Sequence, residues 1–213
     1  MMKKFALPSI ILIVGLLLLA VVFLPDNFIG AAKDSGAKDN KNVVSFPAPS
    51  TYNYSYTYFT SNGKQHKFIT TYLELYNTKG DVIGVAGLVQ MGKQVIVKVN
   101  AGGLTPGKHG FHIHENPITN GDFTTAGGHF NPTGKQHGHD NPKGAHLGDI
   151  QNLVVDQDGK VDQAIVLDGL SLDQGVNNSI LGKSLIIHAK EDDGITEPAG
   201  NSGDRVAGGN IPQ

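Results

Sequence analysis

The stretch Val82–Asn100, VIGVAGLVQMGKQVIVKVN, decides the fold class of this chain. Two runs rich in valine and isoleucine, VIGVAGLVQ and QVIVKVN, lie on either side of a turn at Gly92. Short β-branched runs separated by glycine are typical of strands joined by tight turns. The stretch therefore predicts two strands that follow each other along the chain.

Similar short runs recur on both sides of this stretch. After residue 30 no segment has the strong 3.6-residue periodicity of an amphipathic helix. Several short strands with glycine-rich turns favour an all-β fold, a sandwich or a barrel. The further strands are expected at Lys67–Tyr76 (KFITTYLELY), Gly110–His114, Asp149–Val155, Gln163–Leu167 and Ser184–Ala189.

The composition fits one globular domain and excludes several classes of function. Glycine supplies 28 of the 213 residues, nearly double its usual share of about 7%, as expected for a β-rich chain with many turns. The net charge of −2 offers no basic surface, so no nucleic-acid partner is expected. The lack of cysteine in the sequence excludes disulfides, thiolate metal sites and a cysteine nucleophile.

The N-terminal segment, residues 1–30, is expected to lie outside the globular fold. Lys3 and Lys4 precede Phe5–Leu24, an uncharged run that would span a bilayer as a helix of about 30 Å. Its length favours an uncleaved membrane anchor, while the small residues at Gly30–Ala32 leave a cleaved signal peptide open. Both alternatives predict an extracytoplasmic protein, anchored at the cell surface or secreted.

Residues 31–50 are small and polar and are expected to form a flexible linker. The next segment, 51–69, is expected to add a strand and a hairpin ahead of the main domain, residues 70–213. Its hairpin signal is Asn62-Gly63. Its strand signal is a strict alternation of aromatic residues at Tyr52, Tyr54, Tyr56 and Tyr58.

This tyrosine face has two interpretations. It could form a binding surface, for instance for a sugar or a cell wall. It could also belong to an extra edge strand that covers apolar surface. The second interpretation is favoured because aromatic residues are common in strands.

Two histidines on an expected strand, His112 and His114, are the first sign of a metal site. Residues i and i+2 of a strand point to the same face, so two imidazoles placed there can converge on one metal. The pattern is weak by itself, because two exposed polar positions on one face of a sheet give it more often.

A second group of potential ligands follows in a polar loop. His129, His137, His146 and Asp149 occur with the spacing H-x7-H-x8-H-x2-D. The loop has too few apolar residues to pack a core, so a metal is the best candidate to order it. Three imidazoles and one carboxylate suit tetrahedral zinc, and with every position filled the site would be closed and structural.

His188 and Arg205 each have two interpretations. His188 stands in the apolar run LIIHAK, where a buried core histidine is the ordinary explanation. With His112 and His114, however, it would complete a nitrogen-only set that suits copper. Arg205 is the single arginine of the chain and is either a solvated surface charge or a fixed cation where an anionic substrate docks.

Separated motifs of the chain resemble those of the copper–zinc superoxide dismutases. Their order and spacing match that family from about Thr70 to Gly208. The resemblance implies a Greek-key β-sandwich or barrel with two long functional loops. The motifs are HGFHIHE (His109–Glu115), GGHFNP (Gly127–Pro132), HLGD (His146–Asp149), LIIHAKEDD (Leu185–Asp193) and GNSGDR (Gly200–Arg205).

The resemblance also implies one copper and one zinc per chain. His129 would bridge the two metals and Arg205 would guide the substrate, so these are the expected catalytic residues. Asp192 would link an imidazole of each metal site and orient both. The implied copper ligands are His112, His114, His129 and His188, and the implied zinc ligands are His129, His137, His146 and Asp149.

The implied activity is conversion of superoxide to oxygen and hydrogen peroxide by alternating reduction and oxidation of copper. In this scheme the bridge at His129 breaks, and its imidazole takes up a proton and later supplies it. Superoxide is the expected substrate, the membrane is a partner through the N-terminal segment, and a homodimer is one expected assembly. The alternative is a non-catalytic surface protein that keeps this fold and binds zinc or copper.

One departure from the family concerns a disulfide. The resemblance implies a bridge between the loop before the bridging histidine and the strand after the arginine, but Phe123 and Gly208 stand at the matching positions. Packing of Phe123 is the hypothesis for what compensates. His109 and His139 match no metal position of the family and are expected to be structural or exposed.

Overall fold

The computed structural model describes residues 54–61 and 64–213. The expected N-terminal segment, the linker and Tyr52 lie outside these residues. Within them, no helix is long and apolar enough to cross a membrane. The elements are β1 (Ser55–Ser61), β2 (Lys64–Asn77), β3 (Val82–Met91), β4 (Gln94–Ala101), β5 (Gly107–His114), the 3-10 helix η2 (Phe123–Ala126), β6 (Asp149–Val155), β7 (Val161–Leu167), β8 (Ser184–His188) and β9 (Arg205–Asn210).

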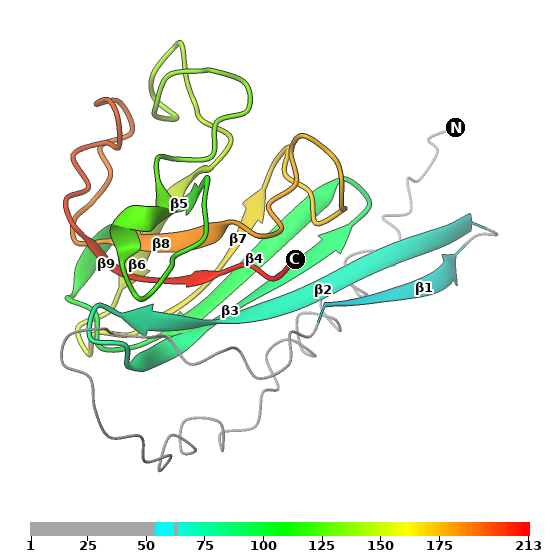
Figure 1. Cartoon of the computed structure of the whole chain (residues 1–213), viewed down its shortest axis with the longest axis horizontal. Coiled ribbons are helices and arrows are strands. Elements are labelled where there is room, and N and C mark those ends of the chain that lie inside the picture. Colours follow the sequence, from blue (N-terminus) through cyan, green and yellow to red (C-terminus); the bar gives the residue numbers. More distant parts are fainter. Residues whose placement is uncertain (1–53, 62–63) are drawn as a thin grey trace, which may run out of the picture. The chain divides into compact units, whose positions relative to one another are not determined.

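The strands form one antiparallel sheet that curls into a nearly closed barrel (Figure 1). Along the sheet the order is β6-β5-β8-β9-β2-β3-β4-β7, and β1 adds to β2 outside this path. The connections from β4 to β5 and from β7 to β8 cross between distant strands of the sheet, as Greek-key connections do. The all-β fold predicted from the sequence is confirmed.

Strands β6 and β7 form the two ends of the sheet, and one side chain joins them across the seam. Gln163 Oε1 accepts a hydrogen bond from Val154 N at 3.0 Å, and Gln163 Nε2 donates to Asn152 O at 3.2 Å. A side-chain amide offers a donor and an acceptor, as a peptide group does. Gln163 therefore takes the place of backbone hydrogen bonds where the barrel does not close.

Alternating side chains build the core in most of the barrel. On β4, Val95, Val97 and Val99 are buried whereas Gln94 is exposed. Strand β8 differs, because every residue from Ser184 to His188 is buried. Its Leu185 and Ile187 belong to the main core, and its Ile186 packs against a separate cluster contributed by the loop before His129.

The residue pattern predicted no strand at Arg205–Asn210, because RVAGGN contains few apolar side chains, and only the family resemblance implied one. Strand β9 lies between β8 and β2. A Cβ at Gly209 would lie 2.1 Å from Glu74 O, and a Cβ at Gly208 would lie 2.5 Å from Leu185 O. Both positions require glycine because the neighbouring backbones approach too closely for a side chain.

The expected tyrosine strand divides into two parts. Tyr54 packs against the core, and its hydroxyl donates a hydrogen bond to Leu172 O at 3.0 Å. Tyr56 and Tyr58 lie further along β1 and are 60% and 52% exposed. The interpretation as a cover over apolar surface therefore holds for Tyr54 and fails for Tyr56 and Tyr58.

Candidate metal centre

Two polar loops project to the same side of the molecule (Figure 1). Residues 115–148 connect β5 to β6, and residues 189–204 connect β8 to β9. In the register of β5 with β8, His112 lies opposite Ile186 and His114 lies opposite Ser184. The side chains on this face converge, so that the ring centroids of His112 and His114 lie 4.8 and 5.6 Å from that of His188, more than 70 positions away in the sequence.

The first cluster consists of His112, His114, His129 and His188. One ring nitrogen of each lies within 4.8 Å of the others, and all these side chains are buried. His129 reaches the cluster because it forms an isolated β-bridge with His114. The structure thus brings together the residues predicted as copper ligands.

His129 also belongs to the second cluster, with His137, His146 and Asp149. The Nδ1 atoms of His129, His137 and His146 lie 2.8, 3.1 and 3.2 Å from Asp149 Oδ1. The other carboxylate oxygen, Oδ2, accepts hydrogen bonds from Gly138 N and His146 N, both at 2.9 Å. These backbone donors hold the carboxylate so that Oδ1 faces the imidazoles predicted as zinc ligands.

In the first cluster, each histidine has one ring nitrogen tied to an acceptor outside the cluster. His112 Nε2 donates to Asp192 Oδ2 at 2.7 Å, His114 Nδ1 to Gly127 O at 3.0 Å, and His188 Nδ1 to Gly203 O at 3.1 Å. Such second contacts fix the tautomer of a metal-binding histidine. They leave His112 Nδ1, His114 Nε2 and His188 Nε2 as lone-pair donors.

Two of the remaining ring nitrogens, His112 Nδ1 and His129 Nε2, are buried without a hydrogen-bond partner. His137 Nδ1 and His146 Nδ1 are buried as well and share one acceptor, Asp149 Oδ1. A buried polar atom without a partner costs about 1–3 kcal/mol. A cation in each cluster would satisfy these atoms. The nitrogen-only set fits copper, and the set of three nitrogens and one oxygen fits zinc.

Burial keeps the first cluster in the protonation state that binds a metal. It lowers the pKa of His112 to about 3, of His114 to about 2 and of His188 to about 4. These imidazoles are therefore neutral at physiological pH, and a neutral imidazole can donate a lone pair to a metal.

The second cluster is electrostatically different because it contains a carboxylate. Burial lowers the pKa of His137, but hydrogen bonding to Asp149 and Asp192 outweighs burial and raises it to about 10. Burial raises the pKa of Asp149, but hydrogen bonds from His129 and His137 outweigh burial and lower it. The cluster thus attracts positive charge, whether a proton or a metal ion.

Asp192 connects the two clusters, as the family resemblance implied. Its Oδ2 lies 2.7 Å from His112 Nε2 and its Oδ1 lies 3.1 Å from His137 Nε2. A Cβ at Gly200 would lie 1.8 Å from Asp192 Oδ1. Glycine at 200 is required for the loop to pass over this carboxylate.

Two residues that the sequence pattern did not identify hold these ligands in place. Asn152 Oδ1 accepts a hydrogen bond from Asp192 N and its Nδ2 donates to Asp192 O, both at 2.9 Å. Glu197 Oε1 accepts a hydrogen bond from His137 N at 2.6 Å. Neither residue lies near its partner in the sequence, so no spacing rule could have identified the contact.

Arg205 stands beside the first cluster, where it is paired with His188 across β8 and β9. Its Nη1 donates a hydrogen bond to Phe123 O and its Nη2 donates to Gly127 O. The side chain is half-buried, and burial lowers the pKa of its guanidinium below the usual range. Arg205 is therefore a positioned cation next to the histidines and not a solvated surface charge.

The remaining two histidines of the motifs lie outside both clusters. His109 is buried, with Nδ1 2.6 Å from His188 O and Nε2 2.7 Å from Thr105 O. His139 is exposed, and its Nε2 lies 3.1 Å from Asp149 O. His109 is therefore structural and His139 is exposed, as expected.

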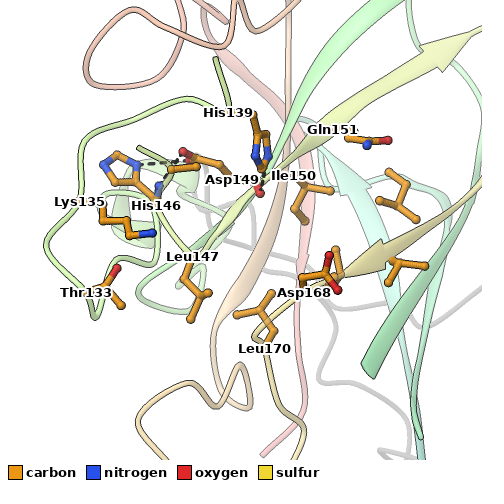
Figure 2. A pocket seen from close by; sticks show the side chains of 14 residues that line it. Thr133, Lys135, His139, His146, Leu147, Asp149, Ile150, Gln151, Asp168 and Leu170 are labelled. Carbon is orange, nitrogen blue, oxygen red and sulfur yellow. Dashed lines mark hydrogen bonds and ion pairs between the residues drawn. The ribbon is translucent and has the colours of Figure 1, made fainter. Parts of the chain in front are cut away.

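A surface pocket of 370 Å³ opens on the outer side of the second cluster (Figure 2). His146 and Asp149 lie at one edge of it, and Leu147, Ile150 and Leu170 line its apolar part. It runs along the seam between β6 and β7 and includes no residue confined to the first cluster. The pocket therefore does not lead to the predicted copper ligands.

The fold and the two clusters, which share His129, define a β-barrel protein with two adjacent candidate metal sites. The family model described as copper/zinc superoxide dismutase (SODC) matches residues 82–211. The chain belongs to the copper/zinc superoxide dismutase family, and its cofactors are copper and zinc.

Relatives and solved structures agree with this assignment. "Superoxide dismutase [Cu-Zn] 2" of Aquifex aeolicus is 42% identical over 67% of this chain and 86% of its own length. "Extracellular superoxide dismutase [Cu-Zn]" of Brugia pahangi is 34% identical over 67% of this chain and 75% of its own. The crystal structure of a SOD-like protein from Bacillus subtilis superimposes with a TM-score of 0.63 at 38% identity, over 66% of this chain and 97% of that one.

Proposed function

We propose that this chain is an extracytoplasmic copper–zinc superoxide dismutase. In the overall reaction, two superoxide ions and two protons give one dioxygen and one hydrogen peroxide. The observation that carries the proposal is the nitrogen-only cluster of buried, neutral imidazoles beside the positioned cation Arg205. The non-catalytic alternative is not favoured, because both clusters are complete and the relatives compared are named as superoxide dismutases or as SOD-like.

The two clusters would hold different metals. When bound, copper at His112, His114, His129 and His188 supplies one-electron exchange with superoxide, and zinc at His129, His137, His146 and Asp149 supplies a fixed positive charge. Asp192 keeps the rings of His112 and His137 in register with each other. The protein thereby holds its ligands in place before the metals bind.

Arg205 has the role of attracting and orienting the anionic substrate. A guanidinium is charged at every physiological pH, and its hydrogen bonds to Phe123 O and Gly127 O fix its position. A fixed cation at the entrance of a site raises the local concentration and the association rate of an anion.

His129 has the role of moving a proton. Its Nδ1 is held by Asp149 Oδ1 at 2.8 Å, whereas its Nε2 is buried and faces no hydrogen-bond partner. Proton uptake at Nε2 and later release would supply one of the protons that peroxide formation consumes. Because Asp149 fixes the ring, the proton would be delivered from one defined position.

The proposed location outside the cytoplasm rests on the sequence pattern of residues 1–30 and on the extracellular relative of Brugia pahangi. Residues 70–213 would form the catalytic domain, with residues 31–50 as linker and 51–69 as an added hairpin. The membrane anchor and the homodimer remain predictions from the sequence.

The proposal is tested by measuring metals and activity on one sample. The full chain, purified in detergent micelles, is loaded with copper and zinc, and the bound metals are quantified before dismutation is assayed. We expect one copper and one zinc per chain together with fast dismutation. Zinc without copper, and no activity after copper is supplied, would contradict the proposal.

A further inference from the structure

The segment between β5 and His129, residues 115–128, supplies the acceptors that hold Arg205. Phe123 O and Gly127 O accept hydrogen bonds from its two terminal nitrogens. Gly127 O also accepts the Nδ1 hydrogen of His114 at 3.0 Å. The position of this segment therefore sets the orientation of both the guanidinium and a predicted copper ligand.

Two polar side chains from paired strands hold the start of this segment. Asn210 Oδ1 accepts a hydrogen bond from Ile118 N at 2.7 Å, and Asn210 Nδ2 donates to Ile118 O at 2.9 Å. Ser184 Oγ donates to Asn116 O at 2.8 Å. Ser184 and Asn210 are register partners across β8 and β9, so they form one rigid support.

An apolar contact holds the same segment between Asn210 and Arg205. Ile118, Phe123 and Ala126 form a buried cluster with Ile186 of β8. A Cβ at Gly208 would lie 3.1 Å from the Phe123 ring, so Gly208 leaves space for that ring. Strand β9 thus contacts the segment with Arg205 at one end, with Gly208 in the middle and with Asn210 at the other end.

We propose that Asn210 is a positioning residue for Arg205. Its side-chain amide holds residues 115–128 against β9 by hydrogen bonds. These hydrogen bonds replace the disulfide that the family resemblance implies and that this chain lacks. The proposal rests on the proposed function, because it assigns Arg205 the task of guiding the substrate anion. Packing of Phe123 alone does not compensate for the missing disulfide.

The chemistry of asparagine explains why this residue type is needed. Ile118 presents a backbone donor and a backbone acceptor 92 positions away from Asn210 along the chain. Only a side chain with both an acceptor oxygen and an NH₂ donor can satisfy the two together. An aspartate at 210 would accept from Ile118 N and would repel Ile118 O.

The single arginine of the chain gives a readout that is independent of activity. In full chain loaded with zinc alone, which is diamagnetic, the side-chain Nε–H signal of Arg205 is the only one of its kind. We expect its order parameter to fall from the range of a rigid group to below about 0.6 in Asn210→Ala. Exchange of the Ile118 amide hydrogen should accelerate about tenfold or more, because its hydrogen bond is lost.

The copper- and zinc-loaded enzyme provides the second readout. In Asn210→Ala the dismutation rate should depend less on ionic strength, because a mobile Arg205 no longer presents a fixed charge to the substrate. Asn210→Asp should give an intermediate result. Asn100→Ala is the matched control, since Asn100 is an exposed asparagine on β4, and it should leave both readouts unchanged.

An unchanged Arg205 order parameter in Asn210→Ala overturns the proposal, and so does faster Ile118 exchange with a rigid Arg205. If Asn210→Ala does not fold, Asn210→Asp decides by the same measurements. Absence of dismutation in the metal-loaded wild type would refute the proposed function, while the zinc-loaded measurements would still decide the role of Asn210.

Discussion

In the half of the barrel formed by β2, β3, β4 and β7, the inward side chains are hydrocarbon, such as Leu75, Leu88 and Val97. In the two loops, residues 115–148 and 189–204, buried imidazoles and a carboxylate (His129, His137 and Asp192) lie beside a few apolar side chains. The first region is held without a ligand by packing of its apolar side chains, and its buried side-chain polar atom without a partner is the hydroxyl Thr71 Oγ1. The second contains buried nitrogens without partners, so its stability depends on what binds there.

Zinc should act almost entirely on the loop region. With free zinc at about 1,000 times its dissociation constant, we expect a stabilisation of about 4 kcal/mol, or a Tm increase of about 8–16 °C. Calorimetry of the metal-free and zinc-loaded chain measures the shift. Hydrogen exchange should place the added protection in residues 115–148, and protection added mainly in β3 and β4 would contradict the contrast between the regions.

Leu88→Ala should produce the opposite pattern. Leu88 is fully buried in the barrel core, and removing its side chain should lower the free energy of unfolding by about 3 kcal/mol, within the usual range of 2–5. Urea unfolding of the metal-loaded variant measures this loss. Metal content and dismutation per folded molecule should match the wild type, and a variant that loses bound copper would show that the regions are coupled.

His129→Ala should reduce activity more than stability. His129 is the one residue shared by both clusters, so its removal takes a ligand from each predicted metal. We expect dismutation to fall by more than about 100-fold, which exceeds the loss usual for a residue that only orients a ligand. Full activity with normal copper and zinc content would exclude the proposed bridge.

In the metal-free chain, acid should destabilise β5 and β8, which carry His112 and His188, before the half of the barrel formed by β2, β3, β4 and β7. Burial lowers the folded-state pKa of His112 to about 3 and of His188 to about 4, below about 6.5 for unfolded imidazole. The unfolded form binds protons first, so stability is complete above pH 6.5 and falls as the pH drops toward these folded values. The expected slope is at most about 1.4 kcal/mol per pH unit for each histidine.

His137 should have the opposite dependence. Its pKa is raised to about 10 in the folded chain, so its contribution is present below pH 6.5 and is lost as the pH rises toward that value. Hydrogen exchange at several pH values, corrected for the intrinsic rate, measures both effects. Equal loss of protection in β5 and β8 and in the half formed by β2, β3, β4 and β7 on acidification would contradict this prediction.

Gln163→Ala tests the seam between β6 and β7, where the barrel does not close. Loss of two hydrogen bonds across the β6–β7 seam should cost about 1 kcal/mol, which urea unfolding can detect. The exposed Gln94 on β4 supplies the control variant Gln94→Ala, with no expected change. If both variants are equally stable, the seam is held by packing and not by this side chain.

The repeating patterns of the sequence were sufficient to predict most strands. The runs around Val82–Asn100 correspond to β3 and β4 within one residue at each end, because alternation along a strand is a local property. Strand β9 could not be predicted in this way. Its glycines are explained only by the backbones of β2 and β8 that lie against them.

The candidate site likewise has one part that the sequence predicts and another that only the structure shows. The spacing of His129, His137, His146 and Asp149 predicted the second cluster, because a metal site requires particular donor types and their identity is visible in the sequence. The complete first cluster, with His129 and His188, followed from the family resemblance. The residues that hold those donors were not visible. Asn152, Glu197 and Asn210 are ordinary polar residues, and only the structure shows which backbone groups they bind.

The sequence alone therefore determined where most strands lie, which side chains can donate to a metal and which family the chain resembles, since each depends on residue type and local spacing. The tertiary structure decided how the histidines of distant segments come together, how Asp192 contacts both clusters and which backbone groups hold Arg205. The physical reason is that these contacts join positions 40 to 92 residues apart. Such contacts form only when strand pairing brings the loops together, and no local pattern encodes that pairing.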